Sequence, residues 1–311
     1  MWLRYGVSAD GALISIEDVP KGKTRVRCPY CQECLTAKKG NIKEHHFAHT
    51  EKTCRSVERP YKELPILPLY DTFNLQLSGQ EIEQLRGLWR EYGAKNYGIP
   101  QYVVPARFIY RRLLQESRNS ERQGYEFTPL GKIPLGALSL KGFQEVQHPL
   151  LLKKLSELEQ KAERAKLLGL STFSELFTDL EIYRAHLSRI FLHSLYFLRT
   201  EVDGQTLYKI GITTRSVEER VKEVQSDLRS HFTNIKIEVL GTWSHRGNVE
   251  KYFKYRYRNF HYPLGRLTEY FTFKDENALV VLRDLERMKP QEFSPLDMDL
   301  LEGQEQNSSI I

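Results

Sequence analysis

The chain has 311 residues, of which 40% are apolar and 28% charged. This composition is typical of globular proteins and excludes a wholly disordered or collagen-like chain. At about 150 residues per domain, the length predicts two domains or slightly more. No apolar run approaches the ~18–20 residues of a membrane-spanning helix, and the first residues lack the basic-then-apolar pattern of a signal peptide. We therefore expect a soluble, cytoplasmic protein with no membrane partner.

Charge is distributed unevenly along the chain. Lysine and arginine number 46 against 40 aspartate and glutamate residues, which gives a formal net charge of +6. Residues 290–311 hold five acidic side chains and no basic one, so residues 1–289 carry +11. A basic body favours a polyanionic partner, most often nucleic acid. We expect such a body, followed by an acidic flexible tail at 290–311.

The first two parts of the chain differ in their predicted elements. Residues 1–59 form short strands and turns, in which 35–38 and 42–47 flank a hairpin tip at 39–41. Prolines cluster in 60–75, which predicts a linker. We expect the middle region, 60–190, to be mostly helical and to act as a spacer, with helices at 78–92, 106–116, 150–168 and 172–190.

From residue 191 the pattern changes to alternating strands and helices. Asp203-Gly204 is a hairpin turn signal, and Ser216 with Glu219 has the spacing of a capping box. The predicted order is β-β-α-β-α-β-α, over 192–200, 206–212, 217–228, 235–239, 248–258, 270–273 and 275–288. The prediction is an α/β multidomain protein: a small zinc-binding β module at 1–59, a helical middle region, and an α/β domain with a small mixed sheet at 191–289.

All four cysteines of the chain fall within 27 positions, between Cys28 and Cys54. Clustered cysteines in a chain without a secretion signal favour a metal site over disulfides. A Cys-x-x-Cys turn supplies two thiolates, and the other ligands must come from the far side of the hairpin. The preferred structural zinc quartet is Cys28, Cys31, His49 and Cys54, with His46 and Cys34 as alternates. The alternative is a set of buried or reactive cysteines that bind no metal.

Three features of this stretch occur in a characteristic order. They are Cys28-Pro-Tyr-Cys31, the turn Lys39-Gly40, and His46-Phe47-Ala48-His49. In this order they resemble the N-terminal zinc-binding segment of competence-protein CoiA-like sequences. The resemblance implies a module attached to nucleases and DNA-processing proteins, with no activity of its own.

The most informative pattern of the chain combines two strand motifs with later residues. They are Leu195-Tyr196-Phe197-Leu198, Tyr208-Lys209-Ile210-Gly211-Ile212-Thr213, Arg220, Glu250 and Thr268-Glu269-Tyr270-Phe271. As a set they resemble the GIY-YIG nuclease domain, in its T5orf172-like branch, over residues 192–275. The first motif lacks its glycine, and Lys209 stands where many members carry tyrosine, with Tyr208 one place earlier.

The resemblance implies a catalytic site formed by Tyr196, Tyr208, Lys209, Gly211, Arg220 and Glu250. A carboxylate suits one Mg²⁺ or Mn²⁺ ion that keeps most of its waters, so Glu250 is the predicted ligand. The fork-shaped guanidinium of Arg220 suits phosphate oxygens. Tyr196 is the family's candidate base; because its ordinary pKa is ~10, a nearby cation must lower it. The structural alternatives are a tyrosine packed on the sheet, an arginine on a solvated helix face and a glutamate that favours a helix start.

Aromatic and basic side chains alternate near the end of this pattern. We predict that Lys254, Tyr255, Arg256 and Arg258 bind nucleic acid through phosphate contacts and stacking; the alternative is a basic amphipathic helix. Together these features predict a metal-dependent DNA endonuclease, with RNA left open because nothing reads the 2′-hydroxyl. The second hypothesis is a non-catalytic nucleic-acid-binding or adaptor protein with a degenerate GIY-YIG fold.

Overall fold

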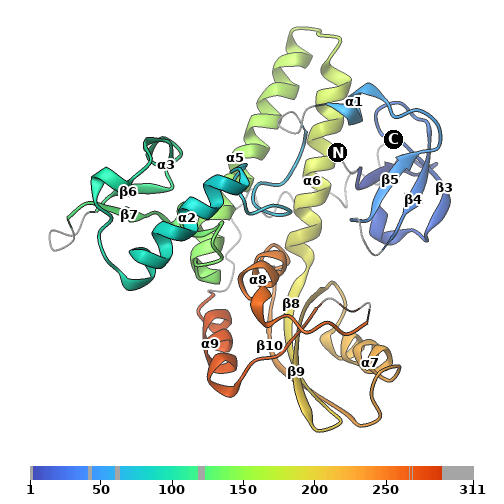
Figure 1. Cartoon of the computed structure of the whole chain (residues 1–311). Helices are drawn as coiled ribbons and strands as arrows, with labels where there is room; N and C mark the ends of the chain where they lie inside the picture. The colour runs from blue at the N-terminus through green and yellow to red at the C-terminus, as the bar shows by residue number, and fades with distance from the viewer. Residues whose placement is uncertain are drawn as a thin grey trace. The chain divides into compact units, whose positions relative to one another are not determined.

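The protein is described by a computed structural model (Figure 1). The structure describes residues 3–40, 44–59, 64–117, 123–265, 267 and 269–288, so the predicted acidic tail at 290–311 lies outside them. No helix within these ranges is long and apolar enough to cross a membrane. The chain packs into two compact units. Of the described residues, the first unit combines those up to Leu67 with Leu151–Phe191, and the second combines Pro68–Leu150 with those from Leu192 to Met288. The predicted middle region therefore contributes to both units.

A five-stranded antiparallel sheet forms the N-terminal part of the first unit. Its order is β2-β1-β3-β4-β5, with bounds Leu13–Ser15, Tyr5–Val7, Gly22–Arg27, Cys34–Lys38 and His46–His49. The predicted hairpin is confirmed, because Leu35 pairs with His49 and Lys38 with His46. Buried Phe47 and Leu35 form its small core with Cys28. The short helices η1 (Ile16–Asp18) and α1 (Arg55–Glu58) complete the module.

Two long helices follow in the chain, α5 (Leu140–Leu167) and α6 (Phe173–Leu192). Both were predicted, but α5 begins ten residues before the predicted start and runs through Pro149. Its first part is helical because Leu140 and Phe143 are completely buried in the core of the second unit. Tertiary packing there outweighs the unfavourable effect of an internal proline.

The segment before α5 differs most from its prediction. The helix predicted at 106–116 ends at Tyr110 as α3 (Ala106–Tyr110), and Leu114–Glu116 is instead strand β6, paired with β7 (Tyr125–Phe127). Arg112 has a φ of 56°, which ends the helix, and Leu114 is buried against Phe127. The linker predicted at 60–75 contains the boundary between the two units, at Leu67 and Pro68, but its described part is packed, because Leu69 and Phe73 are core residues. The other elements here are α2 (Gly79–Glu91), η3 (Gly93–Lys95), η4 (Gln101–Val103) and α4 (Pro129–Lys132).

The C-terminal part of the second unit is a four-stranded sheet in the order β10-β8-β9-β11. The strand bounds are Ile235–Trp243, Ser194–Val202, Gln205–Thr213 and Tyr270–Phe271. The helices are α7 (Val217–Leu228), α8 (Glu250–Arg256), η5 (Arg258–Phe260) and α9 (Asp275–Glu286). The predicted α/β class and element order are confirmed. All strand pairs are antiparallel, however, so the sheet is not mixed. Strand β10 runs in the same direction as β9 and would be parallel to it as a neighbour. The crossover through α7 instead places β10 beside β8, to which it is antiparallel.

The two faces of this sheet have different coverings. On one face, Leu195 and Phe197 pack with α8 and α9 side chains such as Phe253 and Leu285. On the other face, Leu198 packs with Val224 and Leu228 of α7. Because side chains alternate along a strand, neighbouring motif residues are sent to opposite faces.

Candidate functional site

Three residues of the two strand motifs share the sheet face covered by α7. Tyr196 pairs directly with Gly211, and Leu198 pairs with Lys209, in the β8–β9 register. Tyr208 lies on the opposite face, where its ring stacks on Phe197 at a centroid distance of 5.7 Å. The structure therefore brings Tyr196, Lys209 and Gly211 together and places Tyr208 in the apolar core.

Gly211 leaves the space that the Tyr196 ring occupies. A Cβ atom at position 211 would lie 2.3 Å from the Tyr196 hydroxyl oxygen and 2.5 Å from Cζ. Such distances are far inside van der Waals contact, so any larger residue would displace the ring. Tyr196 itself is only 1% exposed. The glycine of the second motif thus fixes the tyrosine of the first.

Helix α7 contributes the guanidinium group of the site. Arg220 Nε donates a hydrogen bond of 3.1 Å to the Tyr196 hydroxyl, and Arg220 also pairs with Glu223 at 2.5 Å. Burial raises the pKa of Tyr196 to about 12, although the Arg220 hydrogen bond acts in the opposite direction. At neutral pH the phenol therefore carries its proton, and Arg220 is placed to stabilise the phenolate when it forms.

A chain of alternating charges joins β9 to α8. Lys209 Nζ lies 2.5 Å from Glu269, and Lys254 Nζ bridges Glu269 at 3.0 Å and Glu250 at 2.8 Å. Burial raises the pKa of the Glu269 carboxyl, but Lys254 and Lys209 together outweigh it and lower that pKa to about 2. Glu269 and Glu250 also raise the pKa of Tyr196, so their charges act at the tyrosine.

Glu269 and Lys254 take places in this site that the sequence reasoning did not assign to them. Glu269 belongs to the Thr268-Glu269-Tyr270-Phe271 motif, which carried no residue role. It directly precedes β11, and because the next residue, Tyr270, pairs with Lys209, the Glu269 carboxylate can reach the Lys209 amine on the neighbouring strand. The signal was present as the one acidic residue of this motif, directly before the two aromatic residues of an edge strand.

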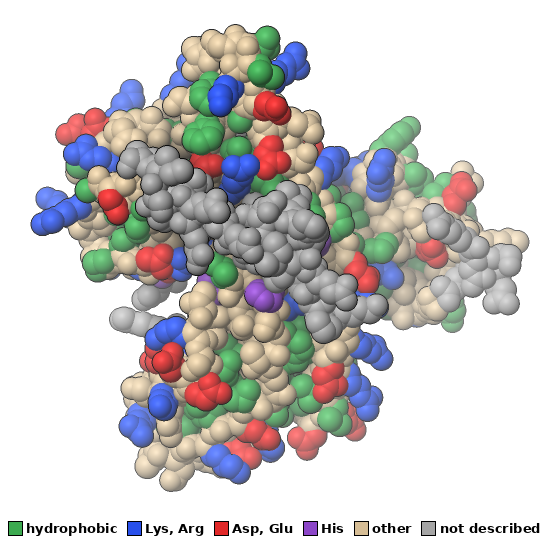
Figure 2. All heavy atoms as spheres, turned by 180° about the vertical axis from the view of Figure 1, so that it is seen from behind, with side chains coloured by type: hydrophobic (Ala, Val, Ile, Leu, Met, Phe, Trp, Pro, Cys, Tyr) green, Lys and Arg blue, Asp and Glu red, His purple; other side chains and the backbone are tan. Residues whose placement is uncertain are grey.

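Of the other residues predicted to bind nucleic acid, Tyr255 and Arg256 of α8 contact neighbouring elements of the second unit. The Tyr255 hydroxyl donates to the Pro134 carbonyl. Arg256 pairs with Asp284 at 2.9 Å and donates to the Gly136 carbonyl at 2.7 Å. Arg258 is exposed, with its guanidinium 4.4 Å from the Tyr255 ring centroid. Nucleic-acid binding by these residues stays a prediction. Figure 2 shows acidic and basic side chains interspersed over the face that it draws.

Glu250 fits the chemistry of a divalent-metal ligand in two respects. It is a hard carboxylate at the first position of α8, and it is 7% exposed, so it is shielded from bulk water. One of its oxygens already pairs with Lys254. A bound Mg²⁺ ion would share this carboxylate with the lysine and keep several of its waters.

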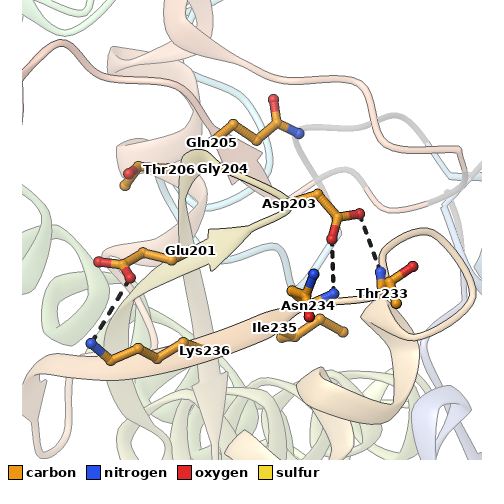
Figure 3. A pocket seen from close by; sticks show the side chains of 9 residues that line it. All are labelled: Glu201, Asp203, Gly204, Gln205, Thr206, Thr233, Asn234, Ile235 and Lys236. Carbon is orange, nitrogen blue, oxygen red and sulfur yellow. Dashed lines mark hydrogen bonds and ion pairs between the residues drawn. The ribbon is translucent and has the colours of Figure 1, made fainter.

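A hollow at the far end of the same sheet is a separate feature. It is lined by the β8–β9 turn and the start of β10, where the Asp203 carboxylate accepts hydrogen bonds from the backbone N–H groups of Thr233 and Asn234 (Figure 3). Asp203 lies seven residues beyond Tyr196 along the hairpin, or roughly 20 Å. The candidate catalytic groups do not line this hollow.

The first unit holds the predicted cysteine–histidine cluster. The sulfur atoms of Cys28, Cys31 and Cys54 and a ring nitrogen of His49 lie within 4.8 Å of one another. Cys28 and Cys54 are 3.9 Å apart at sulfur, and Cys31 Sγ lies 3.3 Å from His49 Nε2. A tetrahedral zinc site with Zn–S bonds of about 2.3 Å has S···S edges of about 3.8 Å. The residues present therefore fit a structural zinc ion.

The two alternate zinc ligands, Cys34 and His46, do not belong to this cluster. Cys34 is exposed in β4, and His46 forms a 2.7 Å hydrogen bond through Nδ1 with the Glu44 carbonyl. Burial raises the pKa of the Cys28 thiol to about 12. A buried thiol of this kind ionises readily only beside a cation, which is the environment that a zinc ion provides.

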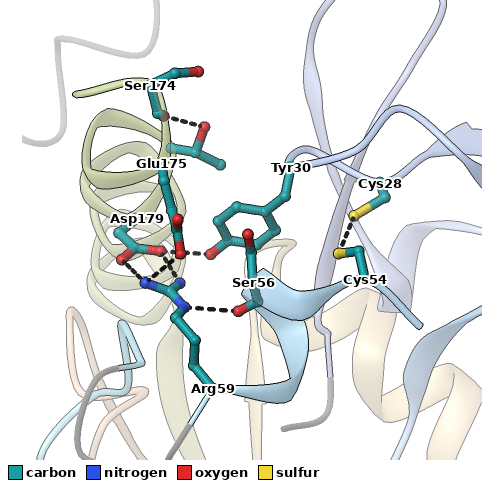
Figure 4. Close-up of polar contacts among 9 residues, drawn as sticks. Cys28, Tyr30, Cys54, Ser56, Arg59, Ser174, Glu175 and Asp179 are labelled. Atoms are coloured by element: carbon teal, nitrogen blue, oxygen red, sulfur yellow. Dashed lines mark hydrogen bonds and ion pairs between the residues drawn. The ribbon is translucent and has the colours of Figure 1, made fainter. Parts of the chain in front are cut away.

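A buried ionic contact holds the cysteine turn against α6. The Tyr30 hydroxyl, between Cys28 and Cys31, donates to Asp179 at 2.6 Å (Figure 4). Arg59 donates to both oxygens of the same carboxylate, at 2.9 and 2.7 Å. This bidentate pair fixes both the end of the module and its central turn to one helix.

The second unit thus holds a buried group of a phenol, cations and carboxylates, and the first unit holds a cluster of three cysteines and one histidine. Compared with known families, residues 193–286 match the T5orf172 domain, and residues 15–57 match the competence protein CoiA, N-terminal domain. The first match extends the resemblance through α9, and the chain thus contains a nuclease-like domain of the GIY-YIG-related type. No curated protein and no solved structure matches the chain.

Proposed function

We propose that the protein is a metal-dependent DNA endonuclease whose reaction takes place at the α7-covered face of the C-terminal sheet. One observation carries the proposal: the Tyr196–Arg220 pair and the Lys209–Glu269–Lys254–Glu250 chain lie close enough together for the charges of Glu269 and Glu250 to act on the Tyr196 hydroxyl. They do so within the stretch that matches the T5orf172 domain. Phosphodiester hydrolysis needs a proton acceptor for the attacking water and positive charge at the phosphate and the leaving oxygen, and a phenol, several cations and a carboxylate that can hold a metal could supply them.

Each group has a role that follows from its contacts. Arg220, which is hydrogen-bonded to Tyr196, and Lys209, which lies on the same sheet face, would stabilise charge on the phosphate oxygens. Tyr196 would accept the proton of the attacking water once its phenolate forms, supported by the Arg220 hydrogen bond. Glu250 would hold Mg²⁺, which when bound supplies Lewis-acid stabilisation of the phosphate and the leaving oxygen. Lys254 and Glu269 position these groups through their ion pairs.

A second candidate function has an observation of its own. Lys254 already neutralises Glu250, and burial keeps Tyr196 protonated, so the same centre is well suited to hold a phosphate without cutting it. The protein would then be a nucleic-acid-binding or adaptor protein. The two functions differ in whether phosphodiester bonds are broken.

A cleavage panel separates them. The zinc-loaded protein is incubated with supercoiled, linear duplex and single-stranded DNA and with RNA, with and without Mg²⁺. We expect Mg²⁺-dependent cleavage of DNA, with a rate that rises from pH 7 to pH 9 as the fraction of Tyr196 phenolate rises. Binding without cleavage in Mg²⁺ and in Mn²⁺ would support the adaptor function and exclude the nuclease.

A further inference from the structure

The segment 92–113 of the second unit combines exposed tyrosines with an excess of positive charge. It contains Lys95, Arg107, Arg111 and Arg112, four tyrosines, and no aspartate or glutamate. It spans η3, η4 and α3, which lie before β6 in the chain (Figure 1). Neither family match covers these residues.

Three of the tyrosines point their rings into solvent. Tyr97 is 63% exposed, Tyr102 87% and Tyr110 86%. The exposure is not the result of a missing core, because Ile99 and Phe108 from the same segment are completely buried. The segment therefore buries Ile99 and Phe108 in the core while the three tyrosines remain exposed.

Several contacts hold the segment in place. Ile99 exchanges two backbone hydrogen bonds with Tyr125, and Arg111 donates to the carbonyls of Leu75 and Gln76. Arg107 and Arg111 also lie 3.6 and 3.5 Å from the Glu81 carboxylate of α2. The tyrosines are thus presented on fixed backbone, which reduces the entropy lost when they bind a ligand.

From these observations we infer that residues 92–113 form a binding surface for single-stranded nucleic acid, with Tyr102 and Tyr110 stacking on unpaired bases. Exposed phenol rings offer flat faces to bases, and the exposed Lys95 and Arg112, which lie outside the Glu81 ion pairs, offer charge to the phosphates. Duplex bases already stack on one another, so rings of this kind favour unpaired strands. The inference rests on the proposed function, because this surface would bind the nucleic-acid substrate that the proposed nuclease cleaves.

Binding is measured separately from cleavage. The fluorescence anisotropy of labelled single-stranded DNA, single-stranded RNA and duplex DNA is followed with zinc-loaded full-length protein and no added Mg²⁺. We expect the Tyr102→Ala/Tyr110→Ala variant to bind single strands about twenty-fold or more weakly than wild type, since each stacked base contributes at least about fivefold. The Tyr102→Phe/Tyr110→Phe variant keeps both rings and should retain wild-type affinity.

A control pair excludes a general effect of surface truncation. Leu279 and Val280 of α9 are 56% and 57% exposed, and Leu279→Ala/Val280→Ala should leave affinity unchanged. Three results would each overturn the inference. The Tyr102→Ala/Tyr110→Ala variant could bind single strands as tightly as wild type, or the Tyr102→Phe/Tyr110→Phe variant could lose as much affinity as the alanine variant. The third is that wild type binds duplex DNA more tightly than single strands. Wild type that binds single strands through the tyrosines but cuts nothing would support this surface and refute the nuclease. Wild type that binds no nucleic acid would refute both.

Discussion

Replacement of Glu250 by glutamine is expected to slow Mg²⁺-dependent DNA cleavage by about a thousandfold. Glutamine keeps the size of the side chain but removes the negative charge that would hold the metal. Losing one group that stabilises charge in the transition state typically costs on the order of a hundred- to a thousandfold. Single-turnover cleavage at saturating protein measures this effect apart from substrate affinity.

The fold should survive this change. Lys254 loses its 2.8 Å ion pair with Glu250 but keeps Glu269 at 3.0 Å, and Lys209 also keeps its ion pair with Glu269. Both lysines therefore retain a carboxylate partner. Glu276, exposed in the first turn of α9, offers the matched control, and Glu276→Gln should cleave at the wild-type rate. Cleavage by the Glu250 variant at the wild-type rate would remove Glu250 from the site.

Removal of zinc is expected to unfold the N-terminal module. Its core is small and includes Cys28, one of the proposed zinc ligands, so few apolar contacts would remain to hold the sheet. Structural zinc sites contribute about 10–16 kcal/mol of binding free energy at neutral pH, which in such modules acts as folding free energy. We expect one zinc per chain, and we expect Cys31→Ser to lose it and to lose amide hydrogen-exchange protection over β3–β5.

Cys34 supplies the matched control for the zinc ligands. It is exposed and lies outside the cluster, so Cys34→Ser should retain one zinc per chain and full protection of the sheet. Loss of zinc from the Cys34 variant, or full retention in the Cys31 variant, would show that the assigned quartet is wrong.

The elements of the C-terminal domain could be predicted because their signals are local. The hairpin at Asp203-Gly204 has both turn residues at positive φ, 43° and 86°, as its dipeptide indicates. Helix α7 spans the predicted residues, and it begins at Val217 because the Ser216 side chain caps its first turn. The prediction of a helix at 106–116 was wrong at its end because the deciding signal is not local. Leu114 is buried against Phe127 of β7, and this tertiary contact leaves no pattern in the local sequence.

The candidate site shows the same division. Strand alternation places Tyr196, Lys209 and Gly211 on one face and could have separated Tyr208 from them, since Tyr208 is adjacent to Lys209. The roles of Glu269 and Lys254 depend on the pairing of β11 with β9 and on the position of α8. The pairing brings together Lys209 and Glu269, which are 60 positions apart in the chain, and single-sequence reasoning cannot supply such a contact.

The central claim is that Tyr196 and Glu250 act on the same scissile phosphate, and a double-mutant cycle tests it most directly. Single-turnover DNA cleavage rates are measured for wild type, Tyr196→Phe, Glu250→Gln and the double variant. Residues that act as one unit give strongly non-additive effects, so the double variant should be about as slow as the slower single variant. Rate losses that multiply in full, or a Tyr196→Phe variant as fast as wild type, would contradict a shared site.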